Sequence, residues 1–152
     1  MTSETFTRVV VTASLPAPVE QVFDAFLSEK VAQHFLFATA TGQMLTARID
    51  ARVGGRYEFT ERRPEMGEVR HVGEYLEIDR PVRLVFTFGV PQFDPRMTTV
   101  TIDIRAIAAG SEVTLTNDGV PQAYAEPNRE GWGRILAGLL PAREGVHGAG
   151  WR

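Results

Sequence analysis

Apolar and polar residues alternate with a period of two through the middle of the chain, whereas periods of three and four appear near both ends. Residues 6–15 are rich in β-branched side chains and alternate in part, which predicts a strand. Two prolines end this strand, and apolar residues three and four apart within 19–27 then predict an amphipathic helix. Residues 28–37 predict a second short helix with Ser28 as its N-cap. The chain is therefore expected to begin with one strand and two short helices.

The middle of the chain is a succession of short alternating segments separated by residues that favour turns. Their spacing predicts six further strands, at 44–51, 56–62, 68–78, 83–89, 98–107 and 112–118. Because the connections have the length of hairpin loops, neighbouring strands are expected to pair antiparallel.

The last regular pattern is helical. Apolar residues at i, i+3, i+4 and i+7 predict a helix over 126–140, and these residues are Trp132, Ile135, Leu136 and Leu139. Gly131 and Gly133 within it indicate a close approach of helix to sheet, a bend of the helix, or a frayed helix. We expect an α+β fold in which a curved antiparallel sheet of six or seven strands wraps around this helix. The 152 residues fit one domain, with a core over about 7–140 and a loose tail over 141–152.

The composition narrows the possible functions. The chain has no cysteine, which excludes disulfides, thiolate metal ligands and a cysteine nucleophile. The formal net charge is −3 with acids and bases interspersed, so no nucleic acid is expected as a partner. The basic pair Arg62 and Arg63 is flanked by acids and is interpreted as a solvated strand end. No apolar run is long enough to span a membrane, and we expect a cytoplasmic protein that needs no metal or cofactor.

Five segments of the chain follow the order of a known family. They are LPAPVEQVFDAFL (15–27), VGGRYEF (53–59), GEYLEIDRPVRLVFTF (73–88), EVTLTNDG (112–119) and EGWGRILAGLL (130–140). With these segments the chain resembles the START-like, or birch-pollen-allergen-like, superfamily, and within it the branch named after the activator of heat-shock protein 90 ATPase homologue. The resemblance implies the helix-grip fold, with a cavity between the concave face of the sheet and the C-terminal helix. It also implies a hydrophobic small molecule as partner, because relatives bind lipids, polyketides and other hydrophobic compounds.

The candidate ligand-binding residues are large apolar side chains on one face of the predicted sheet, on the apolar stripe of the last helix, or at the end of the second helix. The full set is Phe35, Phe37, Tyr57, Phe59, Phe86, Phe88, Val100, Ile102, Trp132 and Leu136. Phe35 and Phe37 are expected near the mouth of the hollow. Periodicity does not distinguish a cavity from a filled core, so both interpretations stay open, and only the resemblance favours the cavity.

No arrangement of catalytic groups stands out in the sequence. His34, His71 and His147 lack the spacing of metal ligands, and His71 is interpreted as a surface residue of its strand rather than a cavity residue. Glu74 faces the interior if strict alternation holds along its strand, whereas a bulge near Gly73 reverses its direction, and the outward orientation is favoured. We therefore assign no catalytic residue.

Three functions follow, in order of preference. The first is the binding of a hydrophobic small molecule in a cavity between the sheet and the C-terminal helix. The second is an enzyme of the polyketide cyclase, dehydratase or hydrolase type acting on such a ligand, and the third is a co-chaperone-like protein-interaction module. A polar group facing the cavity favours the enzyme, a purely apolar lining favours the binder, and a large apolar patch elsewhere favours the module. A homodimer is compatible with each of them.

Overall fold

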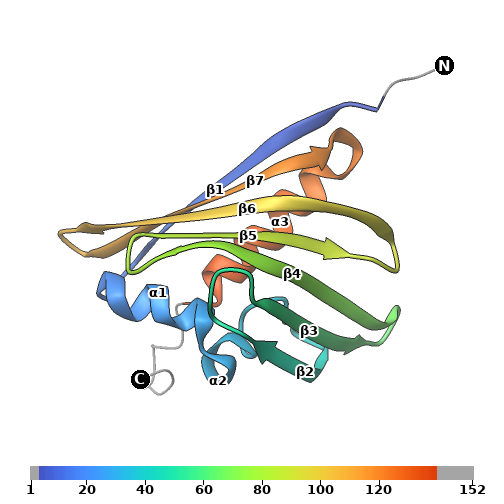
Figure 1. Cartoon of the computed structure of the whole chain (residues 1–152), viewed down its shortest axis with the longest axis horizontal. Coiled ribbons are helices and arrows are strands. Elements are labelled where there is room, and N and C mark those ends of the chain that lie inside the picture. Colours follow the sequence, from blue (N-terminus) through green and yellow to red (C-terminus); the bar gives the residue numbers. More distant parts are fainter. Residues whose placement is uncertain (1–3, 140–152) are drawn as a thin grey trace.

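The computed structural model describes residues 4–139, which form a seven-stranded antiparallel sheet and a small set of helices (Figure 1). The strands are β1 (Phe6–Leu15), β2 (Gln43–Ile49), β3 (Arg56–Arg63), β4 (Gly67–Asp79), β5 (Arg83–Val90), β6 (Asp94–Ile107) and β7 (Gly110–Pro121). The helices are α1 (Val19–Leu27), α2 (Glu29–Ala32), the 3-10 turn η1 (Gln122–Tyr124) and α3 (Ala125–Ala137). The predicted α+β fold, a sheet with a C-terminal helix, is confirmed.

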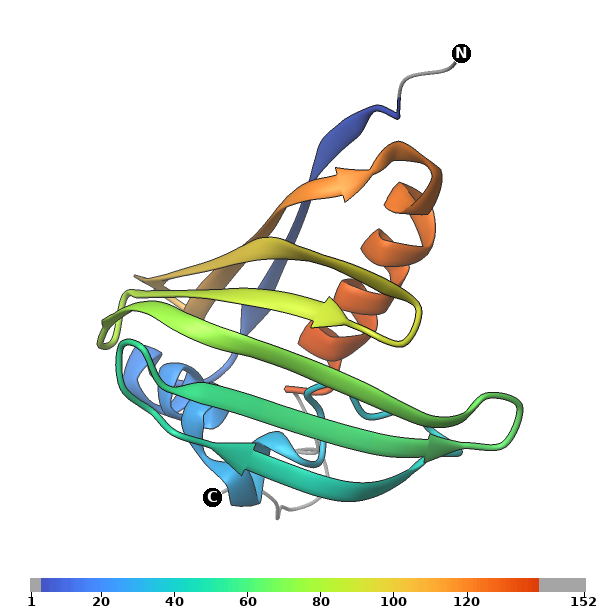
Figure 2. The same cartoon turned by 45° about the vertical axis from the view of Figure 1, so that its right-hand side comes forward.

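The strands lie in the order β1-β7-β6-β5-β4-β3-β2, and each neighbouring pair is antiparallel. Strands β2 to β7 are therefore sequential neighbours, while β1 pairs with β7 and brings the start of the chain beside the last strand. The sheet curls, and α3 lies within its curve (Figure 2). This arrangement leaves β1 and β2 at the two edges of the sheet.

Helix α2 begins as the sequence predicts but ends earlier. The Ser28 hydroxyl accepts a hydrogen bond from the Val31 amide at 3.3 Å, which confirms the predicted N-cap. The helix stops at Ala32, because Phe35, Leu36 and Phe37 are all buried. Three consecutive side chains cannot lie on one face of an α-helix, so this segment leaves the helix to put all three into the core.

The connection between β5 and β6 is shorter than predicted. Residues 90–97 are expected from the sequence to form a loop, but β6 begins at Asp94, whose Cα is paired with Val90. The turn is therefore confined to 91–93. The alternation of hydrophobicity fades in this hairpin, although the backbone pairing continues.

The core lies on the concave face of the sheet, against α1 and α3. The predicted inward residues of β5, β6 and β7 are buried, and they include Leu84, Phe86, Val100, Ile102, Ile104, Val113 and Leu115. Helix α3 contributes Trp132, Ile135 and Leu136 from one face. Complete burial of each such side chain favours folding by about 1.5–3 kcal/mol.

A β-bulge changes which residues of β4 face the core. The register between β4 and β5 shifts between Tyr75 and Glu77. Tyr75 is buried before the bulge and Ile78 packs against the core after it, although strict alternation would put them on opposite faces. Leu76, at the shift, is exposed.

The bulge decides the orientation of the two polar residues left open by the sequence. Val69, His71 and Tyr75 share the inner face, so Glu74 lies on the outer face, the orientation favoured from the sequence. The interpretation of His71 as a surface residue is wrong. His71 lies four residues before Tyr75 on β4, so the two side chains point to the same inner face, and His71 is 5% exposed.

Two further expectations concern the C-terminal part of the chain. A Cβ atom built at Gly131 or Gly133 would have no atom within 4 Å, so neither glycine permits a close approach of α3 to the sheet. The predicted tail over 141–152, which includes His147, lies outside the described residues. Among residues 4–139, none of the helices has the length and apolar character needed to cross a membrane.

Candidate functional site

The structure brings the ten candidate residues into one apolar core. Nine of them are at most 5% exposed, and Phe88 packs partly buried against them. The ten candidate residues are therefore neighbours in the folded chain, as predicted. Their role as ligand contacts stays a prediction, because burial in a common core serves packing and ligand binding alike.

Phe37 lies at the centre of the aromatic contacts instead of at a mouth. Its ring stacks on the rings of Tyr57 and Phe88 at centroid distances of 6.0 and 5.2 Å. It also meets the ring of Trp132 edge-on at 5.7 Å. The backbone φ of Phe37 is +61°, an uncommon value for a bulky residue, and it turns the chain at this point. The ring of Phe37 thereby occupies interior space that the sequence assigned to the hollow.

Tyr57 ties β3 to β5 across the intervening strand β4. Its hydroxyl donates a hydrogen bond to the carbonyl oxygen of Thr87 at 2.7 Å. Burial raises the pKa of Tyr57 well above its ordinary value, so the phenol keeps the proton that it donates. Gly73 makes this contact possible, because a Cβ there would collide with both the Tyr57 hydroxyl and the Thr87 carbonyl.

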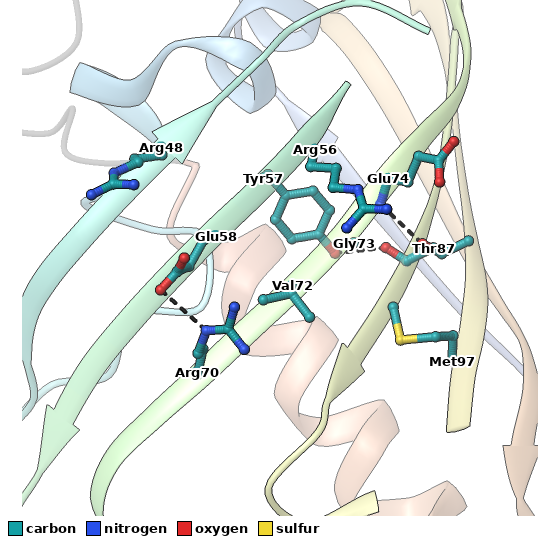
Figure 3. Close-up of a pocket in the computed structure, with 10 residues that line it drawn as sticks. All are labelled: Arg48, Arg56, Tyr57, Glu58, Arg70, Val72, Gly73, Glu74, Thr87 and Met97. Carbon is teal, nitrogen blue, oxygen red and sulfur yellow. Dashed lines mark hydrogen bonds and ion pairs between the residues drawn. The ribbon is translucent and has the colours of Figure 1, made fainter. Parts of the chain in front are cut away.

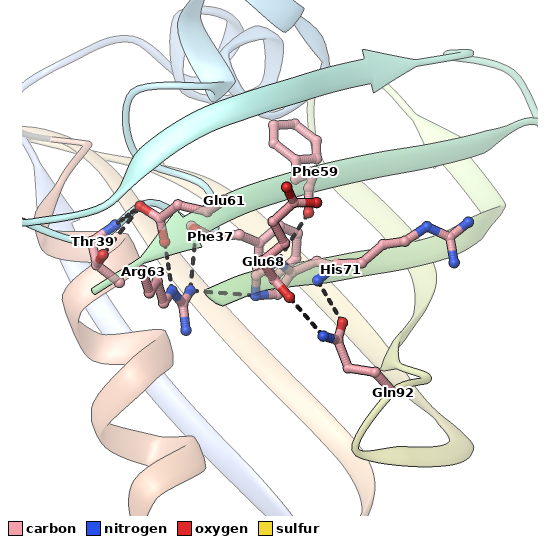
Figure 4. Close-up of polar contacts among 9 residues, drawn as sticks. Phe37, Thr39, Phe59, Glu61, Arg63, Glu68, His71 and Gln92 are labelled. Atoms are coloured by element: carbon pink, nitrogen blue, oxygen red, sulfur yellow. Dashed lines mark hydrogen bonds and ion pairs between the residues drawn. The ribbon is translucent and has the colours of Figure 1, made fainter. Parts of the chain in front are cut away.

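A buried ion pair lies at the end of β3 (Figure 4). Glu61 is 1% exposed, and its Oε1 accepts a hydrogen bond from Arg63 Nε at 2.6 Å. Its Oε2 accepts from the amide and the hydroxyl of Thr39, at 2.7 and 3.1 Å. Gly42 lies against the same carboxylate, because a Cβ at this position would collide with it.

The interpretation of Arg62 and Arg63 as a solvated strand end is therefore wrong for Arg63. The alternation that turns Tyr57 and Phe59 inward continues to Glu61 and then to Arg63, whereas Arg62 stays exposed on the outer face. Pairing and hydrogen bonds compensate for the cost of moving these charges out of water.

His71 joins this cluster in its neutral form. Its Nδ1 donates to the Phe59 carbonyl at 3.0 Å, and its Nε2 lies 3.4 Å from Arg63 Nη2. Arginine offers donors only, so Nε2 must be the acceptor and Nδ1 carries the proton. Burial lowers the pKa of His71 to about 4, and the hydrogen bond to Phe59 only partly opposes this. With both nitrogens engaged and its ring stacked on Phe37 at 4.6 Å, His71 is a packing group.

A hollow of about 650 Å³ lies on the outer face of the sheet (Figure 3). Most of its lining residues are outward-facing residues of β2, β3 and β4 that alternate with the buried ones, namely Arg48, Arg56, Glu58, Arg70, Val72 and Glu74. The buried candidate residue Tyr57 and its neighbour Gly73 also line it. The charges have both signs, and Arg70 Nε donates to Glu58 Oε2 at 3.2 Å. The hollow is therefore a polar surface groove, on the opposite side of the sheet from the core.

A second pocket, of about 340 Å³, opens on the inner side of the sheet. It lies between the β5–β6 hairpin, the end of β7 and the start of α3, and we call it the hairpin pocket. It is lined by Phe88, Gly89, Val90, Phe93, Asp94, Arg96, Thr98, Gly119, Val120, Pro121, Tyr124 and Asn128. Phe93 and Tyr124 are 58% and 54% exposed, so large rings stand at its rim. Of the ten candidate residues, the described lining includes Phe88.

One polar residue of the hairpin pocket, Asn128, is held in place by the buried Asn117 behind it. Asn117 of β7 is fully buried, and its Oδ1 accepts from Trp132 Nε1 at 3.0 Å and from Asn128 Nδ2 at 3.1 Å. Its Nδ2 donates to the Thr98 hydroxyl at 2.9 Å and to the Thr99 carbonyl at 3.1 Å. These bonds tie α3 to β6 and β7 and satisfy the indole nitrogen in the core.

The sequence model of the family described as "Activator of Hsp90 ATPase homolog 1-like protein" matches residues 16–141. The chain belongs to this family. The match spans most of the helix-grip fold, from the start of α1 to beyond the end of α3. No curated protein matches the chain.

Solved structures of bacterial proteins share the fold of this family member. Protein CV1439 from Chromobacterium violaceum is 26% identical, with a TM-score of 0.75 over 87% of this chain and 94% of that chain. An AHSA1-like protein from Aeromonas hydrophila is 20% identical, with a TM-score of 0.73 over 86% and 87% of the two chains. Protein Ms6760 from Mycobacterium smegmatis is 17% identical, with a TM-score of 0.73 over 97% and 99%. The architecture is therefore shared at low sequence identity.

Sequence reasoning missed Asn117 and Asn128, although a signal for each was present. The alternation that places Val113 and Leu115 inward continues to 117, so a polar residue falls on an inward position. Asn128 precedes Trp132 by four residues and therefore lies on the same face of α3. A polar side chain on an inward position of a strand or helix is the pattern to search for.

Proposed function

We propose that this member of the family binds a small hydrophobic molecule in the hairpin pocket. The observation that carries the proposal is the place of the pocket, at which the apolar interior between the sheet and α3 reaches the surface. The position agrees with the hydrophobic ligands that the resemblance to START-like proteins implies. Phe88 lines the pocket and its ring also contacts the rings of Phe37 and Trp132 in the core. A ligand that packs against Phe88 therefore extends the packing of the core.

The size and lining of the hairpin pocket support a small apolar ligand. Its volume of about 340 Å³ lies near the lower end of the range for small-molecule sites, about 300–1,000 Å³. Phe93 and Tyr124 expose large rings at the rim, where an apolar ligand would cover them and remove their surface from water.

The pocket has polar groups, the feature expected from the sequence to favour an enzyme, but these groups are poorly suited to proton transfer. Arg96 Nη2 donates to Asp94 Oδ2 at 2.6 Å, and hydrogen bonds from Arg96 lower the pKa of Asp94 to about 2. A carboxylate held ionised in this way is a poor general acid and a weak base at neutral pH. The Asn128 amide on the inner wall neither gives nor takes a proton, so the pocket is better suited to holding a molecule than to converting it.

The proposal is tested by titrating the ¹⁵N-labelled protein with 1-naphthol, a two-ring probe, and following the amide resonances. The largest shifts are expected within 88–98 and 119–128, which surround the pocket. The double variant Phe93→Ala/Tyr124→Ala should weaken binding several-fold, because it removes the rings that cover the ligand. Leu76→Ala, an exposed residue outside the pocket, is the matched control and should leave the affinity unchanged.

Calorimetry at several temperatures adds a second criterion. Burial of apolar surface should make the heat-capacity change of binding negative. Shifts concentrated around Arg56 and Glu74 on the outer face, or the absence of any saturable shift, would contradict the proposal.

A further inference from the structure

Asn128 holds a buried hydrogen-bond acceptor that the described part of the chain does not use. Its Oδ1 has no hydrogen-bond partner among residues 4–139, although the atom is shielded from solvent. Buried polar atoms are nearly always paired, because a lone one loses its bonds to water without replacement. Asn128 is also one of the residues that line the hairpin pocket, so the unused acceptor lies on a residue of the pocket wall. A ligand reaches this oxygen once the side chain turns slightly toward the pocket.

The orientation of the Asn128 amide follows from its neighbours. Trp132 Nε1 can only donate, so the Asn117 atom 3.0 Å away must be the oxygen Oδ1. The Thr99 carbonyl can only accept, which independently places Asn117 Nδ2 on the other side. Asn117 Oδ1 therefore needs a donor from Asn128, and Nδ2 of Asn128 provides it at 3.1 Å. A flipped Asn128 would set two oxygens against each other, so its Oδ1 is the atom left over.

Apart from the exposed Tyr124 hydroxyl at the rim, the other polar side chains of the pocket already have partners. The Thr98 hydroxyl donates to the Phe88 carbonyl at 3.2 Å and accepts from Asn117 Nδ2. Arg96 binds Asp94, and its Nη1 donates to Glu4 Oε1 at 2.6 Å. Of the described side chains at the inner wall, Asn128 is thus the one with an unused hydrogen-bonding atom, and that atom is an acceptor.

We propose that the ligand of the hairpin pocket is a neutral apolar molecule with a hydroxyl or N–H group, which donates a hydrogen bond to Asn128 Oδ1. This inference rests on the proposed function and adds the polarity of the ligand to it. A carboxylate brings acceptors only, so it would leave Oδ1 unpaired and would lie close to Asp94. A pure hydrocarbon fills the space but also leaves the amide oxygen without a partner. A site built to bond a donor rejects analogues that lack it, because the site's own polar group is then unpaired.

The test compares 1-naphthol with 1-methoxynaphthalene, which has the same rings but no hydrogen to donate. Dissociation constants are measured by calorimetry for the unaltered protein and for variants of Asn128. The unaltered protein should bind 1-naphthol about tenfold more tightly than the ether, the usual size of one hydrogen bond. Asn128→Leu should reduce this ratio to about one by weakening naphthol binding. Leu76→Ala, an exposed residue outside the pocket, is the matched control and should keep the ratio. Tyr124→Phe tests the rim hydroxyl as the acceptor instead, and loss of the ratio in this variant would overturn the assignment to Asn128.

Asn128→Asp separates recognition from structural support, because it keeps acceptor oxygens in the wall but removes the Nδ2 donor that holds Asn117. The preference for 1-naphthol should survive in this variant, because its carboxylate still offers an acceptor to the ligand. Its second oxygen faces Asn117 Oδ1, so thermal melting of both Asn128 variants is measured to confirm that they are folded. Equal binding of the two probes by the unaltered protein, an unchanged ratio in Asn128→Leu, or loss of the ratio in Asn128→Asp overturns the inference while leaving the pocket as a binding site. Binding of neither probe overturns the proposed function and the inference with it.

Discussion

At the scale of single residues, His71 couples the core to pH. It is neutral when folded, since burial lowers its pKa to about 4, whereas the unfolded chain should show the ordinary value near 6.5. Above pH 6.5 both states are neutral and the residue adds no pH dependence. Between pH 6.5 and about 4 the unfolded chain takes up a proton that the folded protein does not. The free energy of unfolding should therefore fall by about 3 kcal/mol across this range on account of His71.

This prediction is checked by chemical denaturation at a series of pH values for the unaltered protein and for His71→Gln. The variant should lose less stability between pH 6.5 and 4, whatever its stability at neutral pH. His34→Gln, at an exposed position, is the matched control for the replacement of a histidine by glutamine. Parallel slopes for the unaltered protein and His71→Gln would show that the buried imidazole is not the titrating group.

At the scale of elements, the glycines of the sheet and of α3 should respond to alanine with opposite signs. Gly131 and Gly133 lie in a helix with open space around the position of a Cβ, so Gly131→Ala and Gly133→Ala should each raise the free energy of unfolding by about 0.5–1 kcal/mol. Gly73 lies against Tyr57 and Thr87, so Gly73→Ala should lower it by about 1–3 kcal/mol or more through overpacking.

Urea denaturation of the three variants measures both effects, and each change serves as the control for the other. A stabilising Gly73→Ala would mean that the Tyr57 hydroxyl does not cross β4 as described. A destabilising Gly131→Ala would place the Cβ against the sheet, the close approach that was one of the interpretations left open by the sequence.

Elements were predictable from the sequence where periodicity is regular, and less so where one residue shifts it. The alternation of Tyr57 with Phe59, and of Val100 with Ile102, identified the inner face correctly. On β4 the bulge next to Leu76 reversed the parity and hid the burial of His71. No local pattern marks such a bulge, because the shift is set by pairing with β5.

At the scale of the whole molecule, the order of strands sets a gradient of stability across the sheet. Strand β6 lies between β5 and β7 and buries Val100, Ile102 and Ile104, whereas β2 is an edge strand without a fully buried side chain. Hydrogen exchange followed by NMR should therefore be slowest for amides at the centre of β6 and much faster for those of β2. Equal protection of the two strands would contradict this gradient.

The overall fold was predictable because one sheet face and one helix stripe must cover each other, and both are visible as periods in the sequence. The candidate site was harder to predict from the sequence. Whether Phe37 fills the interior depends on a single positive φ, and the hairpin pocket is formed by segments of β5, β6, β7 and α3 that meet only in the folded chain. Neither the packing of rings in the core nor the contact between distant segments produces a periodic pattern in the sequence.

The contact between Gly42 and Glu61 has a consequence for how relatives of this protein vary. A side chain at position 42 would occupy the space of the carboxylate at 61, and that carboxylate in turn holds Arg63 and the Thr39 amide. A side chain at position 42 therefore requires the carboxylate at 61 to move or to be replaced. Across the evolutionary history of the family, positions 42, 61 and 63 should be inherited and exchanged as a set, so that descendants with a larger residue at 42 also lack the acid at 61.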